Sequence, residues 1–354
     1  MEYDKYLETE HWKQKRQETL DWWGHKCCIC AAREKLEVHH NNYDRLGNEE
    51  LSDLVVLCNK CHSIYFAVTK KGKVDIRQEL GSIMKELSKG KAFGISTGLS
   101  DLNLLTCGWQ PGELYVLAGC PYSGKTILML NLAMLLCKDN HKVLIMSIEM
   151  PTDKLLLRCL SLLGKLPYRV LRQKDSIPDF SWPRLIIAAT KIQEFGLSLV
   201  DCGGLSIGQI IAQIRYEHKQ NEVDIVFIDH LHLIPTIGFG QNNSEAYGNI
   251  CVALKHLARE LCIPLVLLAQ LKRTKWSPVI SDLYGSGAIE NTADNIWLLR
   301  QVGKSNYNSI EHVELIVAKN KSLETGTIEL DFAGTFMEFR DPDTAKSEES
   351  DLMG

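Results

Sequence analysis

The chain has 354 residues, of which 45% are hydrophobic and 24% are charged, and its formal net charge is −4 at pH 7. This length indicates two or three domains, and the composition is that of a globular protein with enough apolar material for a large core. The charge balance excludes a chain that binds nucleic acid through overall positive charge, so any such contact must come from local patches or loop amides.

The N-terminal region and the apolar runs predict a soluble protein. Residues 1–17 are charged from the second position onward and lack the apolar stretch of a signal peptide. Apolar runs such as Ile263–Leu271 are too short to cross a bilayer. We therefore expect a cytoplasmic protein without a membrane partner (in the host cytoplasm if the source is viral). In that reducing compartment the 12 cysteines are expected to form no disulfides.

Residues 1–67 are dense in cysteine, histidine and aromatic residues. Two pairs of cysteines have the C-x-x-C spacing of metal ligands, namely Cys27, Cys30, Cys58 and Cys61. Four thiolates suit tetrahedral Zn²⁺. A segment of this size has a small core, so a structural zinc ion would supply much of its folding free energy.

Between the two cysteine pairs, LEVHHNNYDRLGNEELSDLVVLCNKCH resembles HNH-type endonuclease modules, over roughly Tyr6–Phe66. The resemblance implies that His40 is a general base for water, and that His39 and His62 lie near a catalytic metal. Asp53 stands where the family has its central asparagine, and Phe66 where a further histidine is frequent. Two interpretations stay open: an active nuclease, and a zinc-stapled module that binds DNA or a partner protein.

Residues 68–92 are predicted to be a linker with one helix. Over Val74–Ser88 the apolar residues recur at helical spacing and form one stripe, consisting of Ile76, Leu80, Ile83, Met84 and Leu87. This helix is too short to be very stable alone. It is expected to pack either on its own chain or on another subunit.

From Phe93 to Arg340 the pattern changes to apolar runs that alternate with helical stretches such as Ser244–Leu261. Three of these runs, 143–150, 224–234 and 263–271, are typical of buried parallel strands. The alternation predicts an α/β fold with a mostly parallel central sheet. The last residues, 341–354, are polar and acidic and are predicted to be disordered.

A phosphate-binding loop is predicted at 119–126. The sequence GCPYSGKT fits the pattern G-x-x-x-x-G-K-[ST] and lies between an apolar strand, Glu113–Ala118, and a helical run, Ile127–Leu136. In such a loop the backbone amides and the helix N-terminus hold the phosphates of ATP. Lys125 would reach the β- and γ-phosphates, and Thr126 would bind Mg²⁺. The predicted loop residues are Gly119, Cys120, Pro121, Tyr122, Ser123, Gly124, Lys125 and Thr126.

Polar residues at the ends of three other predicted strands complete this candidate site. Asp229 ends an apolar strand, where a Walker B aspartate would hold Mg²⁺. Glu149 ends another and would orient and deprotonate the attacking water. Gln270 ends a third and is a candidate γ-phosphate sensor.

Six ordered blocks between Ser96 and Arg340 resemble the C-terminal, RecA-like motor domain of DnaB-type hexameric replicative helicases. They are STGLSDLNLLTCGWQPGEL, SIEM, VFIDHLHLI, LARELCIPLVLLAQLKR, DLYGSGAIENTADNIWLL and AKNKSLETGTIELDF. The resemblance implies a homohexamer with ATP at each subunit interface, movement along single-stranded DNA and unwinding of forked duplex. It also implies primase or a loader as partners, and a linker helix that docks on the neighbouring subunit. Glu149, Asp229 and Gln270 take the roles stated above.

In the last block, Lys319 and Lys321 match the positions that act on a neighbour's phosphate, and the family usually has arginine at the second. Lysine makes only point-charge contacts there. The alternative is that both are surface charges.

The segment KRTKWSPVISDLYGSG matches the family's DNA-contacting loop, with Tyr284 and Gly285 in place of arginine and glutamate. Its candidate DNA-binding residues are Lys272, Arg273, Lys275, Tyr284, Gly285 and Gly287, with Trp276 as a base-stacking ring. Residues 235–249 form a second candidate loop. The alternative is a solvated basic turn.

Three functions therefore stay open at this stage. The first is a hexameric ATP-dependent helicase, with ATP, Mg²⁺ and Zn²⁺ as cofactors. The second is a nuclease effector gated by the motor. The third is a filament-forming recombination ATPase of the RadA type.

Overall fold

The computed structural model describes residues 6–40, 45, 47–59, 61–62, 76–88, 94–173, 177–236, 242–272, 277–302 and 310–342. The chain divides into two compact units, Met1–Lys89 and Gly90–Gly354, which are described separately. Several predicted features lie outside the described residues, namely Phe66, most of the linker around its helix, Arg273, Lys275, Trp276 and the tail from 343 onward.

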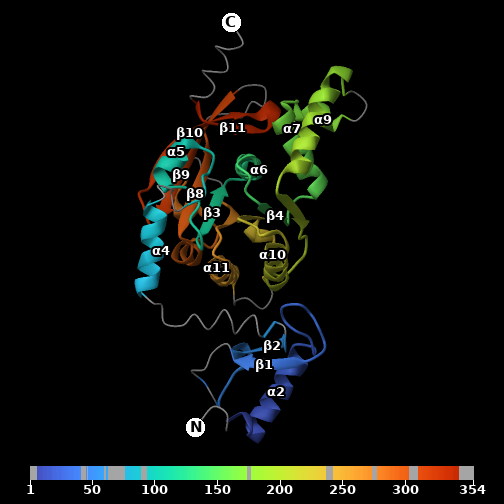
Figure 1. The fold of residues 1–354 in the computed structure, drawn as a ribbon, viewed down its shortest axis with the longest axis vertical. Coiled ribbons are helices and arrows are strands. Elements are labelled where there is room, and N and C mark those ends of the chain that lie inside the picture. Colours follow the sequence, from blue (N-terminus) through green and yellow to red (C-terminus); the bar gives the residue numbers. More distant parts are fainter. Residues whose placement is uncertain are drawn as a thin grey trace. The chain divides into compact units, whose positions relative to one another are not determined.

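The first unit is built on a two-stranded antiparallel sheet (Figure 1). β1 (Leu36–His40) pairs with β2 (Leu54–Cys58), and α2 (Glu10–Trp22) contacts both strands. Thr9 caps α2 by accepting a hydrogen bond from the Trp12 amide at 3.2 Å. A 3₁₀ turn, η1 (Leu51–Asp53), leads into β2, and the helix predicted over 74–88 is described as α4 (Ile76–Ser88).

The second unit contains a nine-stranded sheet in the order β11-β10-β9-β8-β3-β7-β6-β4-β5. The six strands from β8 to β5 are parallel to one another, and β9 to β11 extend the sheet antiparallel. In chain order the strands are β3 (Leu114–Gly119), β4 (Val143–Ser147), β5 (Leu197–Asp201), β6 (Ile225–Asp229), β7 (Leu265–Gln270), β8 (Asn295–Gln301), β9 (Ile310–Asn320), β10 (Gly326–Ala333) and β11 (Glu338–Arg340). The predicted α/β fold with a mostly parallel sheet is confirmed.

Helices cover both faces of this sheet (Figure 1). Its helices are α5 (Ser100–Thr106), α6 (Lys125–Lys138), α7 (Thr152–Gly164), α8 (Tyr168–Arg172), α9 (Trp182–Glu194), α10 (Ile207–Asn221), α11 (Asn243–Leu261) and α12 (Ser286–Thr292). One apolar cluster joins the sheet to α5, α6 and α7, and a second joins its other face to α10, α11 and α12. Because neighbouring residues of a strand point to opposite faces, β3 contributes Leu117 to the first cluster and Val116 to the second.

The strands predicted over 143–150, 224–234 and 263–271 are all shorter in the structure, and the largest difference is in β6. The apolar run 224–234 continues past Asp229, but β6 ends there and Leu231–Leu233 forms a 3₁₀ turn, η3. Leu231 and Ile234 are both buried. Residues three apart lie on the same side of a 3₁₀ turn, so Leu231 and Ile234 are buried together without being in a strand, while Leu233 is 47% exposed.

Among the described residues, no helix is both long and apolar enough to cross a membrane.

Candidate nucleotide-binding site

The loop between β3 and α6 has the geometry of a phosphate-binding loop. Gly124 precedes α6 with a φ of +90°, a conformation that favours glycine. At Gly119 a Cβ would lie 2.5 Å from Oγ of Ser123, so a side chain would not fit where the loop turns back on itself. The predicted glycines therefore stand where the backbone requires them.

Lys125 points into the centre of the loop. Its Nζ donates hydrogen bonds to the carbonyl oxygens of Gly119 at 2.9 Å and Cys120 at 3.0 Å. Burial lowers the pKa of this ammonium, partly offset by the charges of Asp229 and Glu149. An ammonium held in this way is ready to meet an anion.

Thr126 and Asp229 come together at the start of α6. The Thr126 hydroxyl donates to Oδ2 of Asp229 at 2.8 Å. Oδ1 of Asp229 is buried and has no hydrogen-bond partner in the described part of the chain. Burial raises the pKa of this carboxyl to about 6. An orphaned carboxylate oxygen beside a hydroxyl fits Mg²⁺, which prefers oxygen ligands.

Glu149 lies next to this pair because the segment after β4 bonds to the end of β6. The amides of Ile148 and Glu149 donate to the carbonyl oxygen of Asp229 at 2.6 and 3.3 Å. The Glu149 side chain is half exposed, and its Oε2 lies 3.4 Å from Nε2 of His230. Burial lowers the pKa of His230, which favours a neutral imidazole there.

Gln270 completes the site from β7, whose last residue pairs with Gly119. Gln270, Glu149, Lys125 and Thr126 line one cleft of about 440 Å³. The structure thus brings together the sequence-predicted residues of the phosphate loop and of three other strand ends. Two further cleft residues, His230 and Arg158, were missed from the sequence. His230 directly follows Asp229, which was the available signal, whereas Arg158 lies within α7 and has none.

Lys319 and Lys321 lie near the amino ends of the parallel strands, whereas the cleft lies at their carboxyl ends. Lys319 pairs with Ile296 on β8, which pairs with Val116 on β3, whereas Gly119 pairs with Leu299. The step from 116 to 119 spans roughly 10 Å along a strand. Nζ of Lys319 donates to the carbonyl oxygen of Ala293 at 2.7 Å, and Nζ of Lys321 lies 3.6 Å from Asp294. Neither lysine therefore belongs to its own chain's nucleotide cleft.

The described part of the predicted DNA loop packs beside Gln270. The Lys272 amide donates to the carbonyl oxygen of Asp282 at 2.8 Å, and its ammonium lies 5.9 Å from the centre of the Tyr284 ring. Gly285 has a φ of +77° and precedes α12, while a Cβ on Gly287 would meet open space. Tyr284 is 46% exposed, so its ring is available to a ligand.

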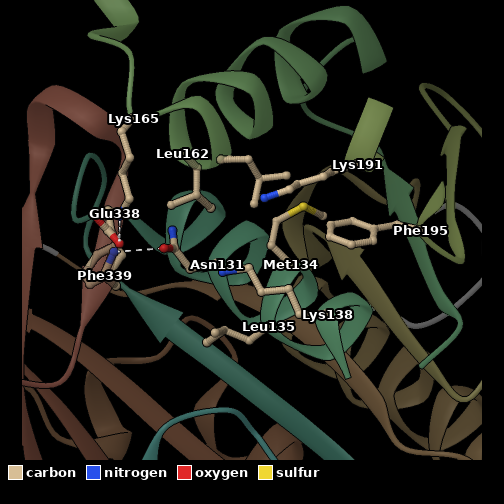
Figure 2. Close-up of a pocket in the computed structure, with 11 residues that line it drawn as sticks. Asn131, Met134, Leu135, Lys138, Leu162, Lys165, Lys191, Phe195, Glu338 and Phe339 are labelled. Atoms are coloured by element: carbon tan, nitrogen blue, oxygen red, sulfur yellow. Dashed lines mark hydrogen bonds and ion pairs between the residues drawn. The ribbon is translucent and has the colours of Figure 1, made fainter. Parts of the chain in front are cut away.

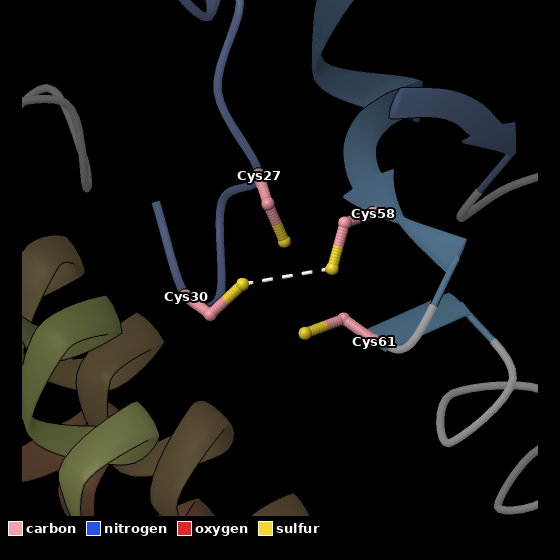
Figure 3. A group of neighbouring side chains, drawn as sticks. All are labelled: Cys27, Cys30, Cys58 and Cys61. Atoms are coloured by element: carbon pink, nitrogen blue, oxygen red, sulfur yellow. Dashed lines mark hydrogen bonds between the residues drawn. The ribbon is translucent and has the colours of Figure 1, made fainter. Parts of the chain in front are cut away.

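The first unit brings the four predicted cysteines together (Figure 3). The sulfur atoms of Cys27, Cys30, Cys58 and Cys61 all lie within 4.8 Å of one another, and those of Cys30 and Cys58 are 3.6 Å apart. Tetrahedral zinc–thiolate bonds of about 2.3 Å place sulfur atoms roughly 3.8 Å apart, so this cluster fits Zn²⁺.

The histidines of the HNH-like motif lie in two environments. His40 has a side chain that is 0% exposed, stacks on Trp12 with ring centroids 4.5 Å apart, and has Nε2 at 3.2 Å from the buried Glu49. His39 and His62 face each other at 3.3 Å, and burial lowers the pKa of His39 to about 4. Asp53 is held by Arg45 at 2.7 Å. The predicted general base is therefore enclosed in the core of the unit.

A second cavity, of about 350 Å³, lies between α6, α7, α9 and β11 (Figure 2). Met134, Leu162 and Phe195 contribute apolar surface to it, and Lys165 forms an ion pair with Glu338 beside it. It contains none of the predicted site residues.

Comparison with known proteins gives a family match over the second unit, which contains the nucleotide cleft. Residues 94–341 match the family model of the DnaB-like helicase C-terminal domain. The chain is 31% identical over 326 residues to the replicative DNA helicase DnaB of Haemophilus influenzae, covering 85% of this chain and 69% of that protein. It is 31% identical over 259 residues to DnaB of Geobacillus stearothermophilus, covering 71% of this chain and 57% of that protein. The chain thus spans 57 to 69% of the length of these relatives.

Solved structures agree about the fold. An ATPase domain is similar with a TM-score of 0.71 and 25% identity, covering 76% of this chain and 99% of that chain. A DnaB-like replicative helicase, solved to show its interactions with primase, has a TM-score of 0.67 and 23% identity, covering 80% of this chain and 76% of that chain. The predicted RecA-like ATPase fold is confirmed.

Proposed function

The chain belongs to the DnaB-like helicase C-terminal domain family, and from this premise we propose that it is an ATP-driven replicative DNA helicase that works as a hexamer. The observation that carries the proposal is the convergence of Lys125, Thr126, Asp229, Glu149 and Gln270 on one cleft. The relatives named above are helicases, which favours this function over a nuclease-gating motor and over a filament-forming ATPase.

Each cleft residue has a separate role in ATP hydrolysis. Lys125 and the loop amides hold the phosphates, and Thr126 with Asp229 holds Mg²⁺, which would neutralise charge on the phosphates. Glu149, half exposed at the cleft, takes a proton from the attacking water. Gln270 contacts the γ-phosphate through its neutral amide.

The positions of Lys319 and Lys321 support an assembly of several subunits. Charge that develops on the γ-phosphate needs an added cation, and these lysines lie at the opposite sheet edge from their own chain's cleft. In a ring, that edge of one subunit faces the cleft of the next. Each lysine then stabilises the phosphate of a neighbour.

Exposed apolar surface on two elements supports the same assembly. On α4, the side chains of Ile76, Leu80, Ile83 and Met84 are all exposed. Around α9, so are those of Phe180, Trp182, Ile186 and Ile187. Large exposed apolar patches mark interaction sites. We assign the α4 stripe to docking on the motor domain of the neighbouring subunit.

The first unit is a zinc module in this proposal. Its four cysteines hold one Zn²⁺, and the enclosed His40 supports a module that binds DNA or a partner protein over one that cuts DNA. Lys272, Tyr284, Gly285 and Gly287 contribute to the DNA-contacting surface of the motor.

The substrates are single-stranded and forked DNA, and primase is the partner of a structurally similar helicase. A loader is a second expected partner, and the cytoplasm is the expected compartment.

Strand separation on a forked duplex, with ATP and Mg²⁺, tests the proposal against a Lys125→Ala control. The wild-type protein is expected to unwind the fork, and the variant is expected not to, because it lacks the cation that holds the phosphates. Hydrolysis of ATP by the wild-type protein without any unwinding would overturn the helicase function.

A further inference from the structure

His232 lies at a junction between the nucleotide cleft and the predicted DNA-contacting loops. It is part of η3, which follows the Asp229 strand. Its Nδ1 accepts a hydrogen bond from the backbone amide of Gln270 at 3.3 Å, and its Nε2 lies 3.5 Å from the carbonyl oxygen of Tyr284. One side chain therefore contacts the main chain of both the phosphate sensor and a DNA-loop residue.

A single tautomer of His232 satisfies both contacts. Because Nδ1 accepts from an amide, it carries no proton, so the neutral ring carries its proton on Nε2. That N–H then donates to the Tyr284 carbonyl oxygen. Burial lowers the pKa of His232 to about 4, which keeps the ring neutral at physiological pH.

Two tyrosine rings contact the imidazole of His232 edge-on. The Tyr247 ring lies edge-on at 4.8 Å and the Tyr284 ring edge-on at 5.8 Å from the His232 ring. Tyr247 also packs on Gly285, where an added Cβ would lie 3.3 Å from its Cδ2. Tyr247 lies on α11, which takes up the last part of the second candidate region, 235–249, and Tyr284 lies in the first. Both regions thus meet at His232.

We propose that His232 is a positioning residue that transmits the nucleotide state sensed at Gln270 to the DNA-contacting loops, an inference that rests on the proposed helicase function. A phosphate contact at the Gln270 side chain shifts the end of β7. His232 then moves with the Gln270 amide to which it is hydrogen-bonded, and the Tyr284 main chain moves with His232. Coupling of this kind requires an element whose position both sites bias, and the imidazole bonds to both.

The test uses the full-length protein with a fluorescein-labelled oligothymidine as the DNA probe. DNA affinity is measured by anisotropy with ADP and with a non-hydrolysable ATP analogue, and ATP hydrolysis is measured with and without DNA. His232→Phe keeps a ring but loses both hydrogen bonds, whereas His232→Gln keeps a donor and an acceptor. His256→Phe, at an exposed histidine of α11, is the matched control.

The wild-type protein and the His256→Phe control are expected to change DNA affinity at least about fivefold between the two nucleotides, the low end of ordinary coupling. In His232→Phe we expect a change below about twofold and no stimulation of kcat by DNA. Its DNA-free kcat and its KM for ATP should be unchanged, and His232→Gln should restore most of the coupling.

Three results would overturn the inference. The first is that His232→Phe retains the coupling, and the second is that His232→Gln fails to restore it. The third is that His232→Phe loses DNA-free hydrolysis, which would make the residue merely structural. A wild-type protein that neither binds DNA nor responds to nucleotide would instead refute the helicase function itself, and the coupling role with it.

Discussion

The hydroxyl of Thr126 donates a hydrogen bond of 2.8 Å to Oδ2 of Asp229, across 103 residues of sequence. Thr126 is the second residue of α6, which follows the phosphate loop, and Asp229 ends β6, two strands away from β3 in the sheet. The second oxygen of Asp229 is buried without a partner in the described structure. This arrangement presents two oxygen ligands to a cation at the start of α6, where the phosphates of a nucleotide are held.

Replacing Glu149 with glutamine should abolish hydrolysis while ATP binding is retained. The amide keeps the shape of the side chain but cannot take a proton from water, and removal of a general base typically costs about 10²- to 10⁴-fold in rate. Steady-state hydrolysis and fluorescent-nucleotide binding measure the two effects. Glu194→Gln, at an exposed position of α9, is the control and should behave as wild type. Hydrolysis by Glu149→Gln within about threefold of wild type would exclude Glu149 as the base.

The strand-end residues of this site were predictable, because the carboxyl ends of parallel strands meet at one sheet edge. Gly119, Glu149, Asp229 and Gln270 each end an apolar run, so their convergence follows from the α/β pattern. The contacts of His232 were not predictable, since they depend on β6 ending at Asp229 and on a turn whose sequence alternates like a strand.

The burial of His40 in the first unit was also not predictable from the sequence. The motif around His40 resembles that of a reactive histidine, yet Trp12, distant in sequence, stacks on its ring and Glu49 binds its nitrogen. Alternation along β1 places His39 and His40 on opposite faces of the strand, and the sequence does not reveal that both side chains are buried.

Asp229→Asn should stabilise the motor domain in the absence of Mg²⁺ and nucleotide. Burial raises the carboxyl pKa from 3.8 to about 6 in the folded protein. The stability associated with this group is therefore present below about pH 4 and is lost as the pH rises through about 6. At pH 7.5 the charged form costs up to about 3 kcal/mol, taking roughly 1.4 kcal/mol per pKa unit, and the variant avoids that cost.

Urea unfolding at pH 7.5 and pH 5.0 measures this effect, with zinc retained in the buffer. The advantage of Asp229→Asn should shrink at the lower pH, where the wild-type carboxyl is largely protonated. Equal stability of the two proteins at pH 7.5 would contradict a buried, destabilising carboxylate. Binding of ATP with Mg²⁺ should weaken in the variant at both pH values.

Removal of zinc should unfold the first unit and leave the motor domain folded. The four cysteines lie within one of two compact units, and the apolar clusters beside them are small. Cys58→Ser should therefore lose the metal and make residues before Lys89 sensitive to proteolysis. Cys28→Ser is the matched control, because Cys28 is not in the four-cysteine cluster, and it should retain one zinc per chain. Full zinc content in Cys58→Ser would exclude this site.

The wild-type protein should not nick DNA with Mg²⁺ or Mn²⁺. The His40 side chain is enclosed between Trp12 and Glu49 and cannot reach a substrate. His40→Ala should instead destabilise the first unit by roughly 1–3 kcal/mol, the cost of leaving a buried polar partner unsatisfied. A supercoiled-plasmid assay and thermal unfolding measure the two outcomes. Metal-dependent nicking by wild type that disappears in His39→Ala would restore the nuclease interpretation.

Charges placed on the exposed stripe of α4 should dissociate the assembly. Leu80 and Ile83 are 54% and 40% exposed, so a double Leu80→Glu, Ile83→Glu variant should leave the monomer folded but unable to dock on a neighbour. Sedimentation should then show smaller species. ATP hydrolysis should fall with the assembly, because Lys319 and Lys321 lie away from their own cleft and are proposed to act on the next subunit.

Lys85→Glu introduces a charge change on the same helix at another exposed position, and it should sediment as wild type does. If the double variant also remains a hexamer, α4 packs within its own chain rather than between subunits. If it dissociates but hydrolyses ATP at the wild-type rate, the role of α4 in assembly is supported, and the proposed action of Lys319 and Lys321 on a neighbour's phosphate is contradicted. The two measurements together therefore separate the role of the helix in assembly from the role of the neighbour's cations in hydrolysis.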